Sequence, residues 1–219
     1  MRKLAVDVVV IGGGSTGAGV VRDVAMRGYS TVLLDRADLG QGTTARFHGL
    51  LHSGGRYVVS DPLSATECAQ ENVILSRIQA SAIETTGGYF VTCPGDDPEF
   101  ADKFLAGASA TGVPAQEIPV AQALKAEPRL NPGILRAIEV QDGSVDGWQL
   151  VWGAARSAEA YGAQILTYHK VTRITRDGNR VAAVHAIDLK NGEEVQIECN
   201  FVLNCAGPWA GQIAAMADC

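Results

Sequence analysis

The sequence predicts an α/β protein: a parallel sheet of the Rossmann type, an antiparallel β-meander and a partial α+β domain between them. Three observations support this expectation. The apolar run 4–11 is followed by a glycine-rich turn, a helical pattern and a second apolar run over 30–35, which together make a βαβ unit. The turns Asp177-Gly178 and Asn191-Gly192 separate apolar runs, as in β-hairpins. Hydrophobic residues form 47% of the 219 residues, enough for a sizeable core.

The remaining elements follow from local patterns, taken in chain order. Residues 40–58 are rich in glycine and polar groups and have no clear period. Helical spacing predicts helices over 16–27, 64–83, 100–111, 120–126 and 148–161. Apolar runs predict strands over 4–11, 30–35, 134–140, 163–167, 171–176, 181–189, 194–198 and 200–205, and Asp142-Gly143 is a predicted turn. The predicted buried face of the helix over 64–83 consists of Ala65, Cys68, Ala69, Val73, Leu75 and Ile78.

Composition excludes several classes of protein. The formal net charge is −6 and no basic stretch is dense, so we expect no nucleic-acid binding. No apolar run approaches the ~20 residues that span a bilayer. The five cysteines are widely spaced and form no C-x-x-C pair. We therefore expect reduced cysteines that act as small buried apolar residues, and a cytoplasmic location.

The glycine turn Gly12-x-Gly14-x-x-Gly17 lies between a predicted strand and a predicted helix. In this setting the glycines permit a tight turn, close approach of a diphosphate and close helix–strand packing. Asp35 ends the second strand, where an acid accepts hydrogen bonds from an adenosine ribose. The predicted cofactor contacts here also include Ser15, Thr16 and Arg36. This motif predicts a dinucleotide site but does not distinguish NAD from FAD.

The long segment from Gly42 to Tyr57 distinguishes the two cofactors. A half-domain that binds only NAD would continue into another compact strand and helix, whereas this chain inserts a long loop. Thr43 and Thr44 offer hydroxyl groups to a diphosphate, and the glycines that follow would let the backbone pass close to a flat ring. A flavin is therefore favoured, while a module that binds only a nicotinamide nucleotide remains an alternative.

Three segments together resemble the FAD-dependent glycerol-3-phosphate dehydrogenases, and most closely the catalytic A subunits of the anaerobic bacterial enzymes. They are the turn from Gly12 to Gly19, the stretch from Thr43 to Tyr57, and Asn204-Cys205-Ala206-Gly207-Pro208-Trp209-Ala210. The motifs Glu71-Asn72-x-Ile74-Leu75 and Asp142-Gly143-Ser144-Val145-Asp146 also resemble that branch. The likeness spans nearly the whole chain, with one departure: Asp35 stands where many relatives carry Glu.

The resemblance implies oxidation of glycerol 3-phosphate to dihydroxyacetone phosphate, with hydride transfer to FAD and electrons passed to a quinone or to partner subunits. It implies that Arg56 and Tyr57 lie at the substrate end, and a planar guanidinium suits a substrate phosphate. An ordinary salt-bridged arginine and a core tyrosine are the alternatives. His52 is either a hydrogen-bond partner of the flavin, the catalytic base or a structural histidine, and a base in the absent C-terminal remainder is a further alternative. Further expected cofactor contacts are His48, Leu50, Val171, Ala206 and Gly207, whereas Trp209 is expected to pack.

No metal site is expected, because Gly49 between His48 and His52 disfavours the helix that would pair them. The predicted domains are a first FAD-binding part over 1–85, a partial substrate domain over 86–146, and a returning FAD-binding part over 147–219. The resemblance implies a longer protein whose C-terminal remainder is absent, and a peripheral location at the inner face of the membrane. The competing functions are an FAD-dependent amino-acid or 2-hydroxy-acid oxidase, and an inactive FAD-binding fragment.

Overall fold

The computed structural model describes residues 1–218 and divides into two compact units. The sheet unit comprises residues 1–48 and the chain from Gly147 onward, and the insert unit comprises Gly49–Asp146. The α/β class predicted from the sequence is confirmed. Cys219, one of the five cysteines discussed above, lies outside the described residues.

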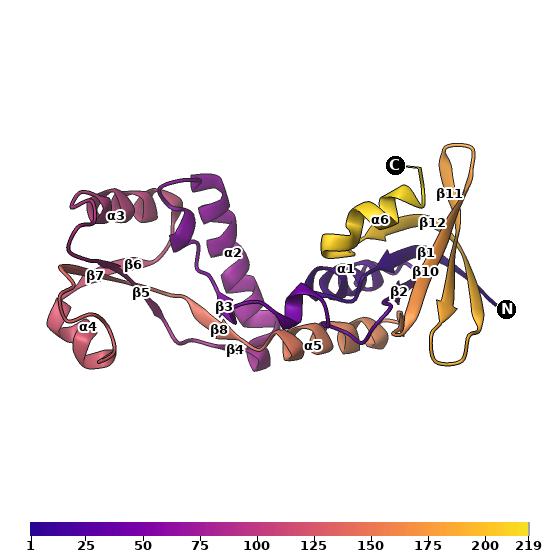
Figure 1. The fold of residues 1–219 in the computed structure, drawn as a ribbon, viewed down its shortest axis with the longest axis horizontal. Helices are drawn as coiled ribbons and strands as arrows, with labels where there is room; N and C mark the ends of the chain where they lie inside the picture. Colours follow the sequence, from indigo (N-terminus) through magenta and orange to yellow (C-terminus); the bar gives the residue numbers. More distant parts are fainter. Residues whose placement is uncertain (219) are drawn as a thin grey trace. The chain divides into compact units, whose positions relative to one another are not determined.

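The sheet unit is built on a six-stranded sheet in the order β10-β11-β12-β1-β2-β9 (Figure 1). Its strands are β1 (Arg2–Ile11), β2 (Thr31–Leu34), β9 (Gln164–Leu166), β10 (His169–Asp177), β11 (Arg180–Asp188) and β12 (Glu194–Asn204). β1 pairs in parallel with β2 and with β12, and β2 pairs in parallel with β9. β10, β11 and β12 are antiparallel and form the predicted meander.

Alternate side chains of the central strands enter two different cores, as the two-residue period of a strand requires. Val8 and Val10 pack with the helices α1 (Ser15–Met26) and α5 (Gly147–Ala160) on one face of the sheet. Val9 and Ile11 pack on the other face with meander side chains and with α6 (Ala210–Ala215). The parallel strands are thus covered on both sides, which explains why their sequences are continuously apolar.

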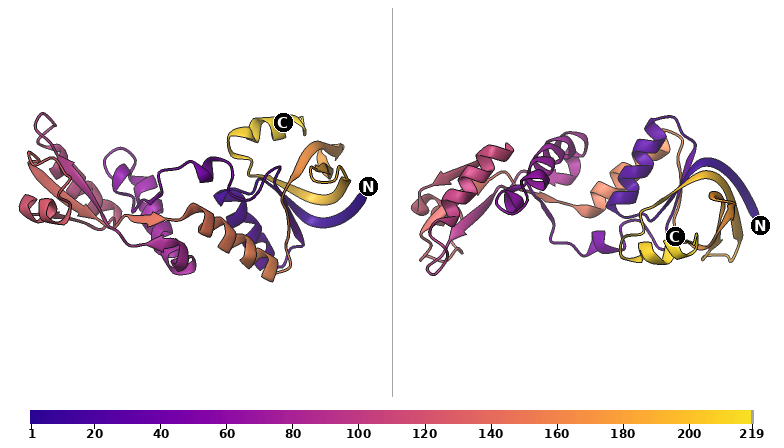
Figure 2. Two further views of the ribbon diagram at one scale, coloured as in Figure 1. Left: turned by 60° about the horizontal axis from the view of Figure 1, so that its bottom comes forward. Right: turned by 90° about the horizontal axis from the view of Figure 1, so that it is seen from above.

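The end of the meander differs from the prediction of two strands over 194–198 and 200–205. β12 is one continuous strand, because β1 pairs with it along its whole length, from Arg2 with Val195 to Ile11 with Asn204. Only its first part also pairs with β11. β1 and β12 curve together in Figure 2. β12 therefore joins the antiparallel meander to the parallel part of the sheet.

The insert unit holds two small sheets. Its strands are β3 (Leu50–Leu51), β4 (Ile83–Glu84), β5 (Gly88–Thr92), β6 (Ala115–Ile118), β7 (Arg136–Val140) and β8 (Gly143–Val145), in the orders β3-β8-β4 and β5-β7-β6. The helices are α2 (Pro62–Ile78), α3 (Phe100–Thr111) and α4 (Val120–Ala126). Short 3₁₀ turns are η1 (Thr43–Ala45) in the sheet unit, η2 (Gly55–Tyr57) and η3 (Ala80–Ala82) in the insert unit, and η4 (Gly207–Trp209) before α6.

Three local predictions for the insert unit are wrong. Asp142-Gly143 is not a turn: Gly143 begins β8, which pairs with β3 and β4 on its two sides. The predicted helix over 64–83 ends at Ile78, and η3 and β4 follow it. Of the predicted buried face of α2, only Ala65 is buried, whereas Val73 is 69% exposed and Ile78 is 46% exposed. The first turns of α2 pack beside η2, where the Ala65 carbonyl lies close to Gly54, and the later turns present apolar side chains outward.

The chain passes from one unit to the other between His48 and Gly49 and again between Asp146 and Gly147, whereas the sequence suggested boundaries at 85/86 and 146/147. Residues 49–85 group with the insert unit because they pack on its core. Gly55 lies against Phe90 and Phe104, and Val58 and Ala65 belong to the Phe104 cluster. The assignment of residues 49–85 to the FAD-binding part stays a prediction, because a residue can pack with one unit and still contact a cofactor.

Candidate functional site

The glycine turn connects β1 to α1, and two of its positions accept no side chain. Gly12 has φ +111°, and a Cβ atom there would collide with the Cys205 carbonyl group at the end of β12. A Cβ atom on Gly17 would collide with the Gly12 carbonyl oxygen. The strand, the turn and the helix therefore lie as close together as backbone allows, which is the packing that the motif predicts.

The helix that follows the turn begins without a side-chain cap of its own. Gly14 is the N-cap residue of α1 and makes no capping hydrogen bond. The Ser15 N–H instead donates to Thr44 Oγ1 at 3.1 Å. The first backbone N–H groups of a helix carry a partial positive charge and favour an anion, so this end of α1 suits a diphosphate.

A cavity of about 530 Å³ opens over this turn within the sheet unit. It brings together eleven of the predicted cofactor contacts: Gly12, Gly14, Ser15, Thr16, Asp35, Arg36, Thr43, Thr44, Val171, Ala206 and Gly207. They come from the turn after β1 and the first residues of α1, from the chain directly after β2 and β12, from η1, from β10 and from the start of η4. A volume of this size is typical of a small-molecule or cofactor pocket.

The Asp35 carboxylate braces the turn. Its Oδ2 accepts the Gly13 N–H at 2.6 Å, and its Oδ1 accepts the Ala37 N–H at 2.7 Å. Each carboxylate oxygen can accept more than one hydrogen bond, so both retain capacity for ribose hydroxyls. The short Asp side chain can thus serve the turn and a ligand at once.

Several cavity residues were not predicted from the sequence. Trp209 was expected only to pack, yet it lines the cavity, and the Arg36 guanidinium carbon lies 4.3 Å from the centroid of its ring. His169, whose Nδ1 lies 2.8 Å from the Thr167 carbonyl oxygen, also lines the cavity. The further lining residues include Phe47, Leu150, Gln212, Ile213 and Met216. The sequence could have indicated Trp209 as a cavity residue, because it lies two residues after the predicted cofactor contact Gly207.

Three predicted cofactor residues are not among the lining residues of this cavity. Gly17 lies beneath the turn, against the Gly12 carbonyl. His48 belongs to the sheet unit, and its ring centroid is 5.8 Å from that of Phe47, which lines the cavity. Leu50 belongs to the insert unit, in β3. Contacts of His48 and Leu50 with a cofactor therefore stay predictions.

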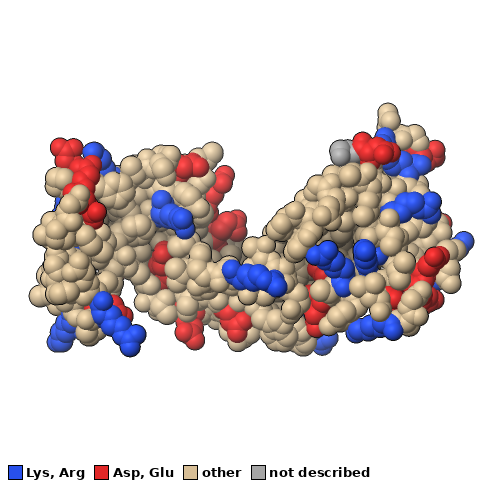
Figure 3. Space-filling view, viewed as in Figure 1, with Lys and Arg blue, Asp and Glu red and all other residues tan. Residues whose placement is uncertain are grey.

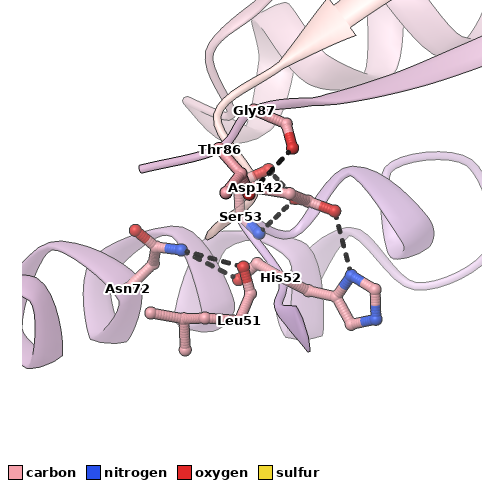
Figure 4. A network of polar contacts seen from close by, with 7 residues as sticks. All are labelled: Leu51, His52, Ser53, Asn72, Thr86, Gly87 and Asp142. Atoms are coloured by element: carbon pink, nitrogen blue, oxygen red, sulfur yellow. Dashed lines mark hydrogen bonds and ion pairs between the residues drawn. The ribbon is translucent and has the colours of Figure 1, made fainter. Parts of the chain in front are cut away.

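The insert unit contains a polar network around His52 (Figure 4). His52 Nδ1 lies 3.0 Å from Asp142 Oδ2. Asp142 Oδ1 accepts the Ser53 N–H at 2.7 Å and the Ser53 hydroxyl at 2.6 Å. Burial acts to raise the pKa of Asp142, but hydrogen bonds from Ser53 and then from His52 outweigh it, so this pKa lies below its usual value. Asp142 is therefore an ionised, fully engaged carboxylate at neutral pH.

Arg56 and Tyr57, the predicted substrate residues, both lie in η2 of the insert unit. Arg56 is exposed, and no ion pair within residues 1–218 involves it, which argues against a structural salt bridge. Tyr57 is partly buried and packs against the Phe104 cluster, so it does contribute to the core. Catalytic and substrate roles for both residues stay predictions.

The surface and the remaining titratable groups add little to these two sites. Acidic and basic side chains are interspersed over the face that Figure 3 shows. In the described part of the chain, no group of three or more His, Cys, Asp or Glu side chains is arranged to hold a metal ion. Over residues 1–218, no helix combines the length and the apolar character needed to cross a membrane.

Comparison with known proteins reveals relatives of both units. Residues 7–219 match the family described as FAD dependent oxidoreductase. The anaerobic glycerol-3-phosphate dehydrogenase subunit A1 of Haloferax volcanii is 44% identical over 98% of this chain, which spans 38% of that relative's length. The chain thus spans well under half of the length of this curated relative.

Two solved structures are also similar. L-proline dehydrogenase from P. horikoshii has a TM-score of 0.86 and 22% identity, covering 100% of this chain and 57% of that one, and this likeness concerns the fold alone. The glycerol-3-phosphate dehydrogenase from Bacillus halodurans, solved with FAD, has a TM-score of 0.70 and 25% identity, covering 97% of this chain and 36% of that one.

Proposed function

The chain belongs to the FAD dependent oxidoreductase family, and from this premise we propose that the protein oxidises sn-glycerol 3-phosphate to dihydroxyacetone phosphate. The observation that carries the proposal is the 44% identity, over 98% of the chain, with an anaerobic glycerol-3-phosphate dehydrogenase subunit. The match extends through both units, so it includes the residues of the glycine turn and those around His52.

The cavity of the sheet unit fits the adenosine diphosphate part of FAD. Any side chain at Gly12 or Gly17 would collide with the backbone, so only backbone lies at these two positions beside the start of α1. In this proposal the diphosphate binds at Gly14, Ser15 and Thr16, with Thr43 and Thr44 as hydroxyl donors. Asp35 accepts the ribose hydroxyls, and Val171 offers its backbone to the adenine. Arg36, Ala206 and Gly207 complete the wall.

Bound FAD supplies the acceptor for the hydride that leaves C2 of the substrate. The chain's own residues handle the proton and the phosphate. His52 takes the proton of the C2 hydroxyl as general base. The exposed Arg56 guanidinium binds the phosphate through two parallel hydrogen bonds, and Tyr57 lies beside it in the same turn.

We also propose that partner subunits or a quinone take up the electrons that the oxidation of the substrate releases. The word "subunit" in the name of the Haloferax relative supports an assembly with other chains. The corresponding location is the cytoplasm, peripheral at the inner face of the membrane through those partners.

Anaerobic titration of the purified full-length protein tests the proposed function. We expect a yellow protein with an absorption maximum at about 450 nm, which glycerol 3-phosphate bleaches with formation of dihydroxyacetone phosphate. L-Proline, glycine and lactate are tested separately as alternative substrates. Bleaching by one of these and not by glycerol 3-phosphate would overturn the proposal, as would a protein that binds a nicotinamide nucleotide and no flavin.

A further inference from the structure

We propose that Asp142 and Asn72 are positioning residues that orient His52 for proton abstraction, with Asp142 selecting its tautomer. The inference rests on the proposed function, in which His52 is the base. Both residues belong to sequence motifs for which the sequence alone indicates no role. The structure brings them to His52 from two different segments, α2 and the connection between β7 and β8 (Figure 4).

The contact between His52 and Asp142 determines where the imidazole proton lies. Asp142 Oδ2 is 3.0 Å from Nδ1, and an ionised carboxylate can only accept hydrogen bonds. Nδ1 must therefore carry the proton, which leaves the lone pair of the neutral ring on Nε2. A general base needs that lone pair, so Asp142 keeps His52 in the reactive tautomer.

Asp142 is itself fixed in orientation, because its two oxygens have different partners. Oδ1 accepts the N–H and the hydroxyl of Ser53 at 2.7 and 2.6 Å, while Oδ2 faces His52. The residue is 8% exposed, so water does not readily replace these partners. Rotation of the carboxylate would break hydrogen bonds that burial makes costly to lose.

Asn72 holds the backbone on which His52 stands. Its Nδ2 donates to the His52 carbonyl oxygen at 3.3 Å and lies 3.5 Å from the Leu51 carbonyl oxygen. The ring of His52 is thus oriented by Asp142 and its main chain by Asn72. A catalytic group held from two sides in this way needs little reorganisation when the substrate arrives.

The substitution Asp142→Asn separates the tautomer role from a structural one. The Ser53 donors keep the amide oxygen on their side, so the amide NH₂ group turns toward His52. Nδ1 must then accept, and the ring proton moves to Nε2. We expect kcat to fall by roughly 10²–10⁴-fold with KM changed by less than about 3-fold, because the base is in the wrong tautomer.

The direct readout is the His52 tautomer, measured by long-range ¹H–¹⁵N NMR on the FAD-loaded full-length protein. The ring signals of His52 are assigned as those that disappear in His52→Gln. We expect Nδ1–H in the wild type and Nε2–H in Asp142→Asn. Asn72→Ala should keep the wild-type tautomer and lower kcat by roughly 10-fold through a less ordered loop. Glu71→Gln is the matched control: it makes the same carboxylate-to-amide change on the exposed neighbour of Asn72 and should leave tautomer and kcat unchanged.

A wild-type His52 protonated on Nε2 would overturn the proposal, and this result needs no variant to fold. So would a folded Asp142→Asn protein with wild-type tautomer and kcat. If glycerol 3-phosphate is not oxidised but the tautomers are as expected, the proposed substrate fails while the orienting role of Asp142 stands. If glycerol 3-phosphate is oxidised and the His52 tautomer is the same in the wild type and in Asp142→Asn, only the positioning role of Asp142 fails.

Discussion

Asp35 and Gly13 are joined by a hydrogen bond of 2.6 Å from the Gly13 N–H to the Asp35 carboxylate, which ties the end of β2 to the glycine turn. The same carboxylate accepts the Ala37 N–H through its other oxygen. The acid predicted to bind the ribose therefore also stabilises the turn that receives the diphosphate. Loss of its charge should affect folding and cofactor binding together.

Asp35→Ala removes the acceptor of two backbone N–H groups, and Asp35→Asn can retain only one, since its amide has a single oxygen. We expect the free energy of unfolding to fall by about 1–3 kcal/mol in Asp35→Ala and by less in Asp35→Asn. FAD retention should fall in the same order. Urea unfolding of the cofactor-free protein and flavin content after gel filtration measure the two effects. Equal stability of all three proteins would contradict the bracing role.

Two glycines of α1 make a matched pair. A Cβ atom at Gly17 meets the Gly12 carbonyl, whereas one at Gly19 meets nothing within 4 Å. Gly17→Ala should therefore lower the melting temperature and abolish FAD binding, because β1 and α1 must move apart. Gly19→Ala should raise stability by about 0.5–1 kcal/mol, since Ala favours a helix over Gly. Calorimetry and flavin absorption test both, and FAD binding by a stable Gly17→Ala protein would contradict the close-packing argument.

Arg56 is exposed and makes no ion pair within the described residues, so its removal should leave folding intact. We expect Arg56→Ala in the full-length enzyme to raise KM for glycerol 3-phosphate by roughly 10–100-fold, the loss of a charged hydrogen-bond pair worth about 1.5–3 kcal/mol. Flavin content and melting temperature should not change. Arg77→Ala, another exposed arginine, serves as the control. Unchanged steady-state kinetics would remove Arg56 from the substrate site.

Cys199 is the one buried thiol among the described cysteines, and burial raises its pKa to about 11. At pH 8 only ~0.1% is thiolate, so iodoacetamide should label it far more slowly than the partly exposed Cys93. Peptide mass spectrometry after timed labelling measures the rates. Similar rates at the two sites would show that Cys199 is accessible.

The same shift makes stability depend on alkaline pH. The folded state favours the neutral thiol, so its contribution is present below the ordinary pKa of 9.0 and is lost as the pH rises through about 11. The Cys199→Ala protein should lack this component of the alkaline loss. Urea unfolding of both proteins at a series of pH values from about 8 to about 10.5 follows the difference.

Local sequence signals predicted the elements whose boundaries depend on nearby residues. The helix over 100–111 ends at Thr111, directly before Gly112 with its φ of +72°, and the helix over 120–126 begins directly after Pro119. The glycine turn was predicted for the same reason, since its strand, helix and second strand lie within one short stretch. In these segments tertiary packing and local sequence preference favour the same structure.

Features set by distant pairing were missed. Asp142-Gly143 has the local pattern of a turn, but β3 and β4 pair with β8 and extend the backbone there. The apolar residues of α2 have helical spacing, yet no neighbouring element among the described residues covers Val73. The approach of Asp142 to His52 leaves no periodic trace in the sequence. In each case a partner far along the chain, or the lack of one, decides the outcome.

The continuous pairing of β1 with β12 has a consequence for biosynthesis. A ribosome releases residues 2–11 early, but their parallel partner over 194–204 emerges only after the intervening chain has been made. The insert unit is contiguous in sequence and can collapse during that interval, whereas the first strand must wait with one edge open. Nascent chains stalled before residue 194 should therefore recruit chaperones through that waiting edge.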